Sequence, residues 1–271
     1  MVSTFSSDNN HYLRPLDDNY IISATQSTGT KGYTLAGWQQ RYGLDLSSKK
    51  SPASISPYVI NSYLSSNKYS NGDFITSISG ASCWNDIGSC HLSWDTTQLD
   101  GGALKVSFNS QIPTADSLLT VPVGTVSPGK EYILKYDFIA DSNNGSSIMI
   151  YLRKRGSPYT ILTPKYYKLI STSRAGNEIL FSPSTIETDT AVVFEISKGD
   201  STNNAMWFDN IQLYEADVTK TNPDDYIFFD YNPTFQDKAI TLDGSYMDLD
   251  GNPVSGSVTI KPYESIILIK D

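Results

Sequence analysis

The chain contains 271 residues, of which 39% are hydrophobic, 12% aromatic and 18% charged, and its formal net charge is −9. The rich aromatic supply excludes an intrinsically disordered chain, and no apolar run approaches the roughly 20 residues that a membrane helix needs. The acidic balance disfavours nucleic acid as a partner, because phosphate binding requires a basic surface, whereas a neutral polysaccharide would not be repelled. The abundance of Ser, Thr, Asn, Gly and Tyr is typical of an extracellular all-β protein.

Residues 1–57 contain short strand-like pieces and one short predicted helix. The helix is expected to begin after Thr34 as N-cap and to end at Tyr42, with Gly43 as the stop signal. The first five residues have neither the basic nor the apolar region of a signal peptide. We therefore expect the chain to be the C-terminal part of a larger protein that is secreted or displayed at the cell surface.

Cys83 and Cys90 enclose a short loop rich in Gly and Asn. Two interpretations are open: a local disulfide, which we favour and which implies an oxidising compartment, or two free thiols. Two cysteines with His91 nearby do not make a zinc site. Trp84 and Trp94 flank the loop, which would hold both rings rigidly.

Residues 58–216 form a run of strands in which apolar and polar residues alternate, with turn signals between them. The apolar sets include Leu104, Val106 and Phe108; Tyr132, Leu134, Tyr136 and Phe138; Ile148, Ile150 and Leu152; and Val192, Phe194 and Ile196. A period of two buries one face of each strand and presents the other, so the pattern predicts an antiparallel β-sandwich. Tyr151, Arg153 and Glu195 fall on the presented face. The basic cluster Arg153–Arg155 is interpreted as a solvated strand end or turn.

Residues 217–271 have their own pattern of about five short strands. The segment Asp248–Asn252 superficially resembles a calcium loop but lacks the twelve-residue spacing and the closing Glu, so we interpret it as a hairpin turn. A unit of fifty-odd residues is small for independent folding, and we expect it to pack against a neighbouring domain.

Two motifs bracket the middle segment: Asn71-Gly72-Asp73-Phe74 and Met206-Trp207-Phe208-Asp209-Asn210-Ile211-Gln212-Leu213-Tyr214. This bracketing resembles that of the jelly-roll carbohydrate-binding modules of families 4, 9 and 22. The resemblance implies a jelly roll over residues 58–216 and a polysaccharide or oligosaccharide as partner. It also implies a structural calcium ion where the first and last strands meet, at Asp73 and Asp209; the alternative is two Asp residues without metal.

The flanking segments resemble other parts of bacterial polysaccharide-degrading proteins. The last segment is similar to a small C-terminal β-sandwich, in Phe229–Thr234, Leu242–Tyr246, Asp250-Gly251-Asn252 and Pro262–Leu268. The first is similar to the closing coils of a parallel β-helix, in Asn9–Pro15 and Trp38–Asp45. The resemblance implies a β-helix-like remnant with most of the solenoid outside this chain.

A sugar site needs exposed rings along a groove with a few polar groups that fix orientation. The candidates are Trp84, Trp94, Tyr151, Arg153, Tyr159, Tyr166 and Glu195. Each has an alternative role, since a Trp in a sandwich is more often part of the core and an outward Tyr is often only a surface residue. Trp207, in the closing strand, is expected to be structural.

Catalysis has little support in the sequence. No motif marks the pair of carboxylates that glycoside hydrolysis requires, and neither His11 nor His91 belongs to a Ser-His-Asp pattern. We therefore predict an all-β protein with three parts: a β-helix-like terminal segment at 1–57, an antiparallel jelly-roll sandwich at 58–216 and a small β-sandwich at 217–271. The predicted function is non-catalytic binding of a plant cell-wall polysaccharide, xylan or β-glucan, on behalf of an attached glycoside hydrolase. The alternatives are a fragment of a polysaccharide-degrading enzyme, and a structural or adhesive spacer without a ligand.

Overall fold

The computed structural model describes residues 6–17, 21–26, 29–85, 90–108, 116–143, 145–196 and 205–270. The chain forms two compact units, one made of residues 1–21, 44–59 and 219–271 and the other of residues 22–43 and 60–218. Residues 22–43, which the sequence pattern groups with the N-terminal segment, therefore belong to the same unit as the sandwich.

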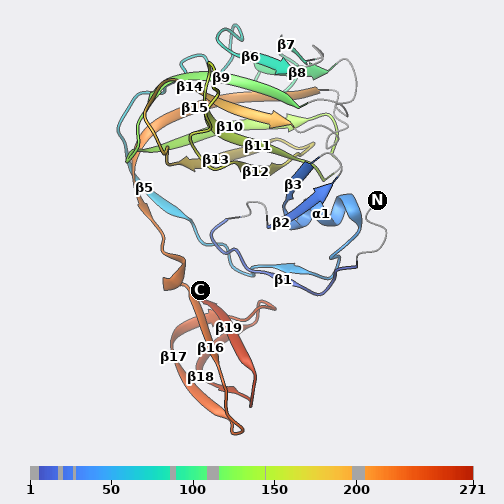
Figure 1. The fold of residues 1–271 in the computed structure, drawn as a ribbon, viewed down its shortest axis with the longest axis vertical. Coiled ribbons are helices and arrows are strands. Elements are labelled where there is room, and N and C mark those ends of the chain that lie inside the picture. The colour runs from blue at the N-terminus through green and yellow to red at the C-terminus, as the bar shows by residue number, and fades with distance from the viewer. Residues whose placement is uncertain are drawn as a thin grey trace. The chain divides into compact units, whose positions relative to one another are not determined.

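The second unit is a sandwich of two antiparallel sheets, stacked in the upper part of Figure 1. One sheet has the order β13 (Ala175–Phe181), β10 (Glu131–Ala140), β15 (Ala205–Lys220), β8 (Ala103–Phe108) and β7 (Cys90–Asp95), with β5 (Tyr58–Tyr63) also paired to β15. The other has the order β12 (Tyr166–Leu169), β11 (Ser147–Lys154), β14 (Glu187–Ile196), β9 (Ser117–Val126) and β6 (Ser82–Asn85). The predicted all-β, antiparallel sandwich is confirmed.

Alternation along the strands builds the core between the two sheets. The buried cluster contains every second residue of the central strands, among them all four apolar sets named from the sequence. Rings from both sheets meet there, such as Tyr136 and Phe194, whose centroids lie 5.1 Å apart. The residues between these positions point to the outer face of each sheet.

The two bracketing motifs meet in space. The amide of Ile211 donates a hydrogen bond of 2.9 Å to the carbonyl of Gly72. Asn210 has a left-handed backbone with φ of 52°, where the pairing of β15 with β10 shifts register at a β-bulge. A Cβ on Gly72 would lie only 1.8 Å from the carbonyl oxygen of Ile211, so this approach of two backbones requires glycine.

The predicted helix is present as α1 (Leu35–Tyr42). The hydroxyl of Thr34 accepts a hydrogen bond from the amide of Gly37, and Gly43 closes the helix in the left-handed conformation. The hairpin of β2 (Ile22–Gln26) and β3 (Gly29–Tyr33) precedes it. The guanidinium of Arg41 donates to the hydroxyl of Ser146, so the helix is anchored beside the start of β11.

The first unit has two sheets of its own. β1 (His11–Tyr12) and β4 (Lys49–Lys50) pair in parallel, and β16 (Ile227–Tyr231), β19 (Ser265–Lys270), β17 (Lys238–Met247) and β18 (Pro253–Ile260) form one antiparallel sheet after the short helix η1 (Pro223–Asp225). The C-terminal strands thus pair as a single sheet, not as the two sheets of the predicted small sandwich. The N-terminal β-helix-like remnant stays a prediction.

The segment Asp248–Asn252 is a hairpin turn between β17 and β18, as predicted. The side chain of Asp248 accepts hydrogen bonds from the amides of Asp250 and Asn252, at 2.9 and 2.8 Å. Lys49 donates to the carboxylate of Asp250 at 2.6 Å, which fastens this turn to β4 within the same unit.

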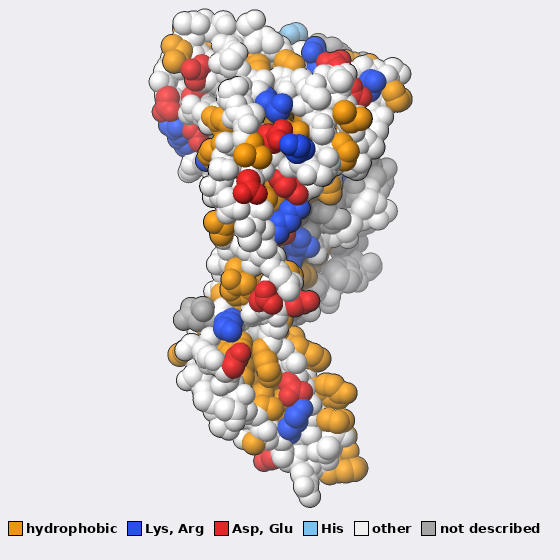
Figure 2. All heavy atoms as spheres, turned by 90° about the vertical axis from the view of Figure 1, so that its left-hand side faces the viewer, with side chains coloured by type: hydrophobic (Ala, Val, Ile, Leu, Met, Phe, Trp, Pro, Cys, Tyr) orange, Lys and Arg blue, Asp and Glu red, His pale blue; other side chains and the backbone are white. Residues whose placement is uncertain are grey.

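Hydrophobic side chains remain exposed along one side of the C-terminal sheet, in the lower part of Figure 2. The exposed rings of the C-terminal residues 227–270 include Phe229, Tyr231, Phe235 and Tyr263. Neither helix in the described part of the chain has the length and apolar character to span a membrane.

Candidate functional site

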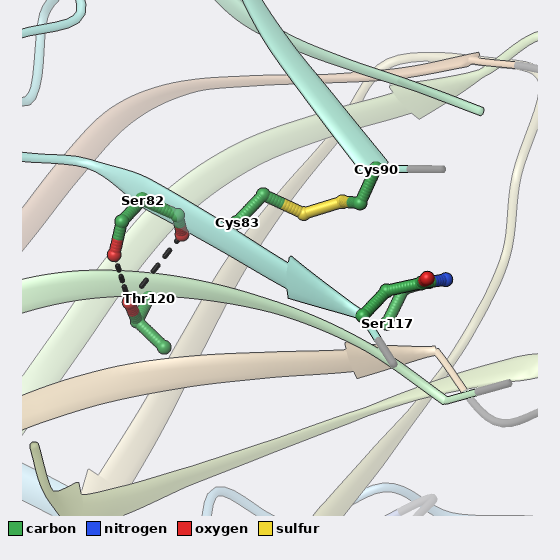
Figure 3. Close-up of a disulfide and its surroundings, with 6 residues drawn as sticks. Ser82, Cys83, Cys90, Ser117 and Thr120 are labelled. Carbon is green, nitrogen blue, oxygen red and sulfur yellow. Dashed lines mark hydrogen bonds between the residues drawn. A yellow bond between two sulfur atoms is a disulfide. The ribbon is translucent and has the colours of Figure 1, made fainter. Parts of the chain in front are cut away.

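A disulfide between Cys83 and Cys90 orients the strand that carries Trp84. The bond joins β6 of one sheet to β7 of the other, with the two Cα atoms 6.0 Å apart (Figure 3). Cys83 packs against the core, and since neighbouring residues in a strand point to opposite faces, Trp84 points outward. Its side chain is 57% exposed. The predicted disulfide is therefore confirmed, and one of the two flanking Trp rings is displayed on the outer face of β6.

The neighbouring strand β9 adds a polar and an apolar contact beside Trp84. Trp84 is registered opposite Leu118, and Ser82 opposite Thr120. The hydroxyl groups of Ser82 and Thr120 lie 2.7 Å apart (Figure 3). An indole face thus lies next to hydroxyl groups, the combination that binds the apolar face and the hydroxyls of a sugar ring.

Beyond β11, the chain turns back and presents a second exposed ring. The amide of Lys154 donates to the carbonyl of Thr160, and Arg153 forms a single β-bridge with Ile161. Tyr159 lies in this turn with a left-handed backbone, φ of 59°, and its side chain is 53% exposed. The guanidinium carbon of Arg153 lies 5.0 Å from the centre of its ring, so the cation and the ring hold each other in place.

Together these side chains line a groove of about 550 Å³ on the face of the five-stranded sheet that points away from the core. Its lining residues are Ser82, Trp84, Leu118, Thr120, Arg153, Arg155, Gly156, Tyr159 and Asp189. Between β11 and β6 the groove crosses three strand spacings, roughly 14 Å. That length accommodates a short stretch of a linear sugar chain.

One ion pair is built into the groove. The guanidinium of Arg155 lies 3.3 Å from the carboxylate of Asp189, and the amide of Arg155 donates to the carbonyl of Asp189 at 2.9 Å. Asp189 belongs to β14, which pairs with β11. Both side chains are exposed, so their attraction adds little to stability, and their contribution is to the charge pattern of the groove.

Tyr151 and Glu195 lie on the same outer face of the sheet but are covered. Tyr151 is only 2% exposed, and its hydroxyl donates to the carboxylate of Glu195 at 2.7 Å. Lys165 donates to the same carboxylate at 2.8 Å, and its amine lies 4.8 Å from the centre of the Tyr151 ring. Burial, and then the charge of Glu195, raise the pKa of the Tyr151 hydroxyl. The expectation that this strand pattern displays Tyr151 and Glu195 is wrong, because Lys165 covers them.

Two further candidates lie away from the groove. Tyr166 packs against the core and donates through its hydroxyl to the carbonyl of Leu180 at 2.8 Å, so its ring is not available to a ligand. Trp94 is 46% exposed, but it belongs to β7 in the other sheet, and its indole N–H donates to the carbonyl of Phe74 at 2.7 Å. Of the predicted rings, the structure brings together Trp84 and Tyr159, with Arg153 beside them.

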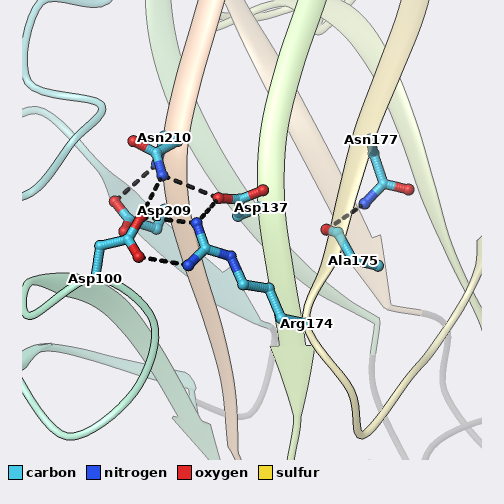
Figure 4. Close-up of polar contacts among 7 residues, drawn as sticks. All are labelled: Asp100, Asp137, Arg174, Ala175, Asn177, Asp209 and Asn210. Carbon is cyan, nitrogen blue, oxygen red and sulfur yellow. Dashed lines mark hydrogen bonds and ion pairs between the residues drawn. The ribbon is translucent and has the colours of Figure 1, made fainter.

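The carboxylate of Asp209 lies in a network of opposite charges (Figure 4). Arg174 pairs with both Asp100 and Asp137, and the side-chain amide of Asn210 donates to the same two carboxylates at 3.1 and 2.9 Å. Asp209 itself is 1% exposed and accepts from the amide of Asn210 at 2.7 Å. Burial, with the two neighbouring carboxylates, raises its pKa to about 6.

These residues do not fit a calcium site well. Asp73 is exposed, Asp209 is buried, and Arg174 supplies the positive charge that the neighbouring carboxylates need. Among the described residues, no three His, Cys, Asp or Glu side chains converge as metal ligands. Calcium at Asp73 and Asp209 stays a prediction.

The sequence does not predict most of the residues that line the groove beside the two rings. Ser82, Leu118 and Thr120 carry no signal by themselves, and the interpretation of Arg153–Arg155 as a solvated strand end or turn does not predict that Arg155 lines a groove. Its partner Asp189 is 34 positions further along the chain, and only strand pairing brings the two together. The spacing of two positions between Arg153 and Arg155 is the one local indication that both side chains point to the same side of the sheet.

No protein-family model and no curated protein matches the sequence. Among solved structures, the chain is similar to the family 11 carbohydrate-binding module of a cellulosomal cellulase of Clostridium thermocellum, with 12% identity over 60% of this chain and 97% of that one and a TM-score of 0.40. It is also similar to the CBM22-1 xylan-binding domain of Paenibacillus barcinonensis Xyn10C, with 9% identity over 58% and 97% of the two chains and a TM-score of 0.39.

A third similarity is to an arabinose-bound GH51 α-L-arabinofuranosidase, with 11% identity, 55% of this chain covered and a TM-score of 0.46. The aligned part spans only 26% of the arabinofuranosidase.

Proposed function

We propose that the groove of the five-stranded sheet binds a carbohydrate chain without cleaving it. The observation that carries the proposal is the pair of exposed rings, Trp84 and Tyr159, lining one groove together with hydroxyl groups and guanidinium groups. Rings stack on the apolar faces of sugars, and the polar groups bond to their hydroxyls. The proposed ligand class is a plant cell-wall polysaccharide, xylan or β-glucan.

The disulfide supports this role because it fixes the strand next to the stacking ring. A ring held in place before binding loses less conformational freedom when a sugar stacks on it. The disulfide also supports a secreted or cell-surface location, where such bonds persist. We propose that this binding holds an attached glycoside hydrolase close to its polysaccharide.

The charges of the groove support binding over catalysis. Glycoside hydrolysis uses two carboxylates facing the scissile bond, one of them with a raised pKa. Asp189 is the one carboxylate among the described residues that line the groove, and it is paired with Arg155. An enzyme fragment and a ligand-free spacer are the outcomes that the following test would reveal.

The test compares the two exposed Trp residues by affinity electrophoresis in gels that contain xylan, β-glucan or no polysaccharide. Trp84→Ala should abolish most of the retardation, because it removes the stacking face in the groove. Trp94→Ala is the matched control: it removes an indole that is 46% exposed from the other sheet and should leave retardation unchanged. Thermal melts would show that both variants are folded.

The size of the effect follows from the exposed face of Trp84. A Trp side chain has up to about 250 Å² of surface. Its exposed share is 57%. If a sugar covers about half of that share, roughly 70 Å² leaves water, worth about 1.8 kcal/mol or roughly 20-fold in affinity. Equal losses in both variants would contradict the assignment of the groove, absence of retardation of the wild-type chain would favour the spacer, and release of reducing sugar would favour the enzyme fragment.

A further inference from the structure

The two guanidinium groups of the groove differ in what neutralises them. Arg155 is paired with Asp189 at 3.3 Å. Within the described part of the chain, Arg153 has no carboxylate partner and contacts the face of Tyr159 instead. The groove therefore carries one uncompensated positive charge in a protein whose net charge is −9.

Arg153 also has an unused hydrogen-bond donor. Its Nε is buried and has no hydrogen-bond partner among the described residues, although buried polar groups are nearly always paired. The side chain is held in position by the ring of Tyr159, with its guanidinium carbon 5.0 Å from the ring centre. Because a ligand cannot reach the buried Nε, the two terminal NH₂ groups of this fixed guanidinium would be the donors to a group with two acceptor oxygens, through two parallel hydrogen bonds.

We propose that the groove prefers sugar chains that carry an anionic substituent, and that Arg153 binds that substituent. This inference rests on the proposed function. The shared chemistry is a charged group with two or more oxygens on the sugar: the carboxylate of a uronic acid or a sulfate ester. Trp84, on β6 at the other edge of the sheet, would stack on the neutral part of the chain, while the anionic group lies over β11. Arg155 is a second cation in the groove, and its pairing with Asp189 limits its attraction for the same anionic group.

The test measures the binding of matched oligosaccharides by isothermal titration calorimetry. Neutral oligosaccharides from xylan and from β-glucan are each compared with versions that carry one glucuronate or one sulfate ester. The wild-type chain should bind at least one anionic version about tenfold more tightly than its neutral parent, the size expected for a charge-assisted hydrogen bond at a partly exposed site. Which version is preferred distinguishes the carboxylate from the sulfate.

Two substitutions should act in opposite directions. Arg153→Gln should weaken the binding of the anionic version about tenfold more than the binding of the neutral parent, and so remove the preference. Asp189→Asn should free Arg155 and increase the affinity for the anionic version by about threefold or more. Lys135→Gln and Glu178→Gln are the charge-matched controls: these residues form an ion pair of 3.4 Å on strands of the other sheet and should leave the preference unchanged.

Equal affinity of the wild-type chain for neutral and anionic versions would overturn the inference and leave the proposed function intact. The same holds if Arg153→Gln weakens both versions alike, because Arg153 would then only position Tyr159. If the wild-type chain binds neither version of either oligosaccharide, the proposed function itself fails.

Discussion

The contact between Gly72 and Ile211 allows a stability prediction that depends on a single methyl group. In Gly72→Ala, the new Cβ would lie 1.8 Å from the carbonyl oxygen of Ile211 and 2.7 Å from its carbonyl carbon. Both are backbone atoms, so no side-chain rotation relieves the overlap, and β15 must move away. The movement also threatens the 2.9 Å hydrogen bond from the amide of Ile211 to the carbonyl of Gly72.

The expected cost combines overpacking, about 1–3 kcal/mol, with the loss of a hydrogen bond, about 0.5–1.5 kcal/mol. We expect Gly72→Ala to lower the free energy of unfolding by about 2–4 kcal/mol. Urea unfolding followed by Trp fluorescence measures it, because all four Trp residues of the chain belong to the unit that contains the sandwich.

Gly156→Ala is the matched control for this measurement. A Cβ at Gly156 meets no atom within 4 Å, and we expect a change within about 0.5 kcal/mol. If Gly72→Ala proves as stable as Gly156→Ala, the two backbones do not approach each other as closely as described. The explanation of why the two bracketing motifs occur together would then also be wrong.

Two further predictions concern the covalent and the electrostatic features of the sandwich. Replacing Cys83 and Cys90 together by Ser should lower the free energy of unfolding by about 2–3 kcal/mol, the loop-closure entropy of a short disulfide loop, in the same urea assay; unchanged stability under oxidising conditions would contradict the bond. The folded-state pKa of Asp209 is about 6, above its ordinary value of 3.8, so this residue's contribution to stability is fully present below pH 3.8 and is lost as pH rises through 6. Urea unfolding at pH 5 and pH 7 should show Asp209→Asn gaining stability relative to the wild type at pH 7, and a difference that does not depend on pH would contradict the raised pKa.

Short-range patterns predicted much of this protein correctly because their physical causes are local. The alternation of Leu104, Val106 and Phe108 with Lys105 and Ser107 determines which face of β8 is buried in the core, whatever that face packs against. The caps Thr34 and Gly43 fix the ends of α1 through hydrogen bonds within a few residues. The disulfide is similarly local, since its cysteines are seven positions apart.

The binding groove depended on tertiary structure, because its chemistry comes from residues that are distant in the chain. Alternation places Tyr151 and Arg153 on the same outer face, but only the packing of Lys165 decides that the first is covered, while the second lines the groove. Likewise, Trp84 and Trp94 are equivalent in the sequence, and the passage of the chain from β6 in one sheet to β7 in the other separates them. Sequence periodicity predicts to which face of its own strand a side chain points. Whether that side chain is exposed, and which charges lie next to it, depends on the distant residues that pack against that face.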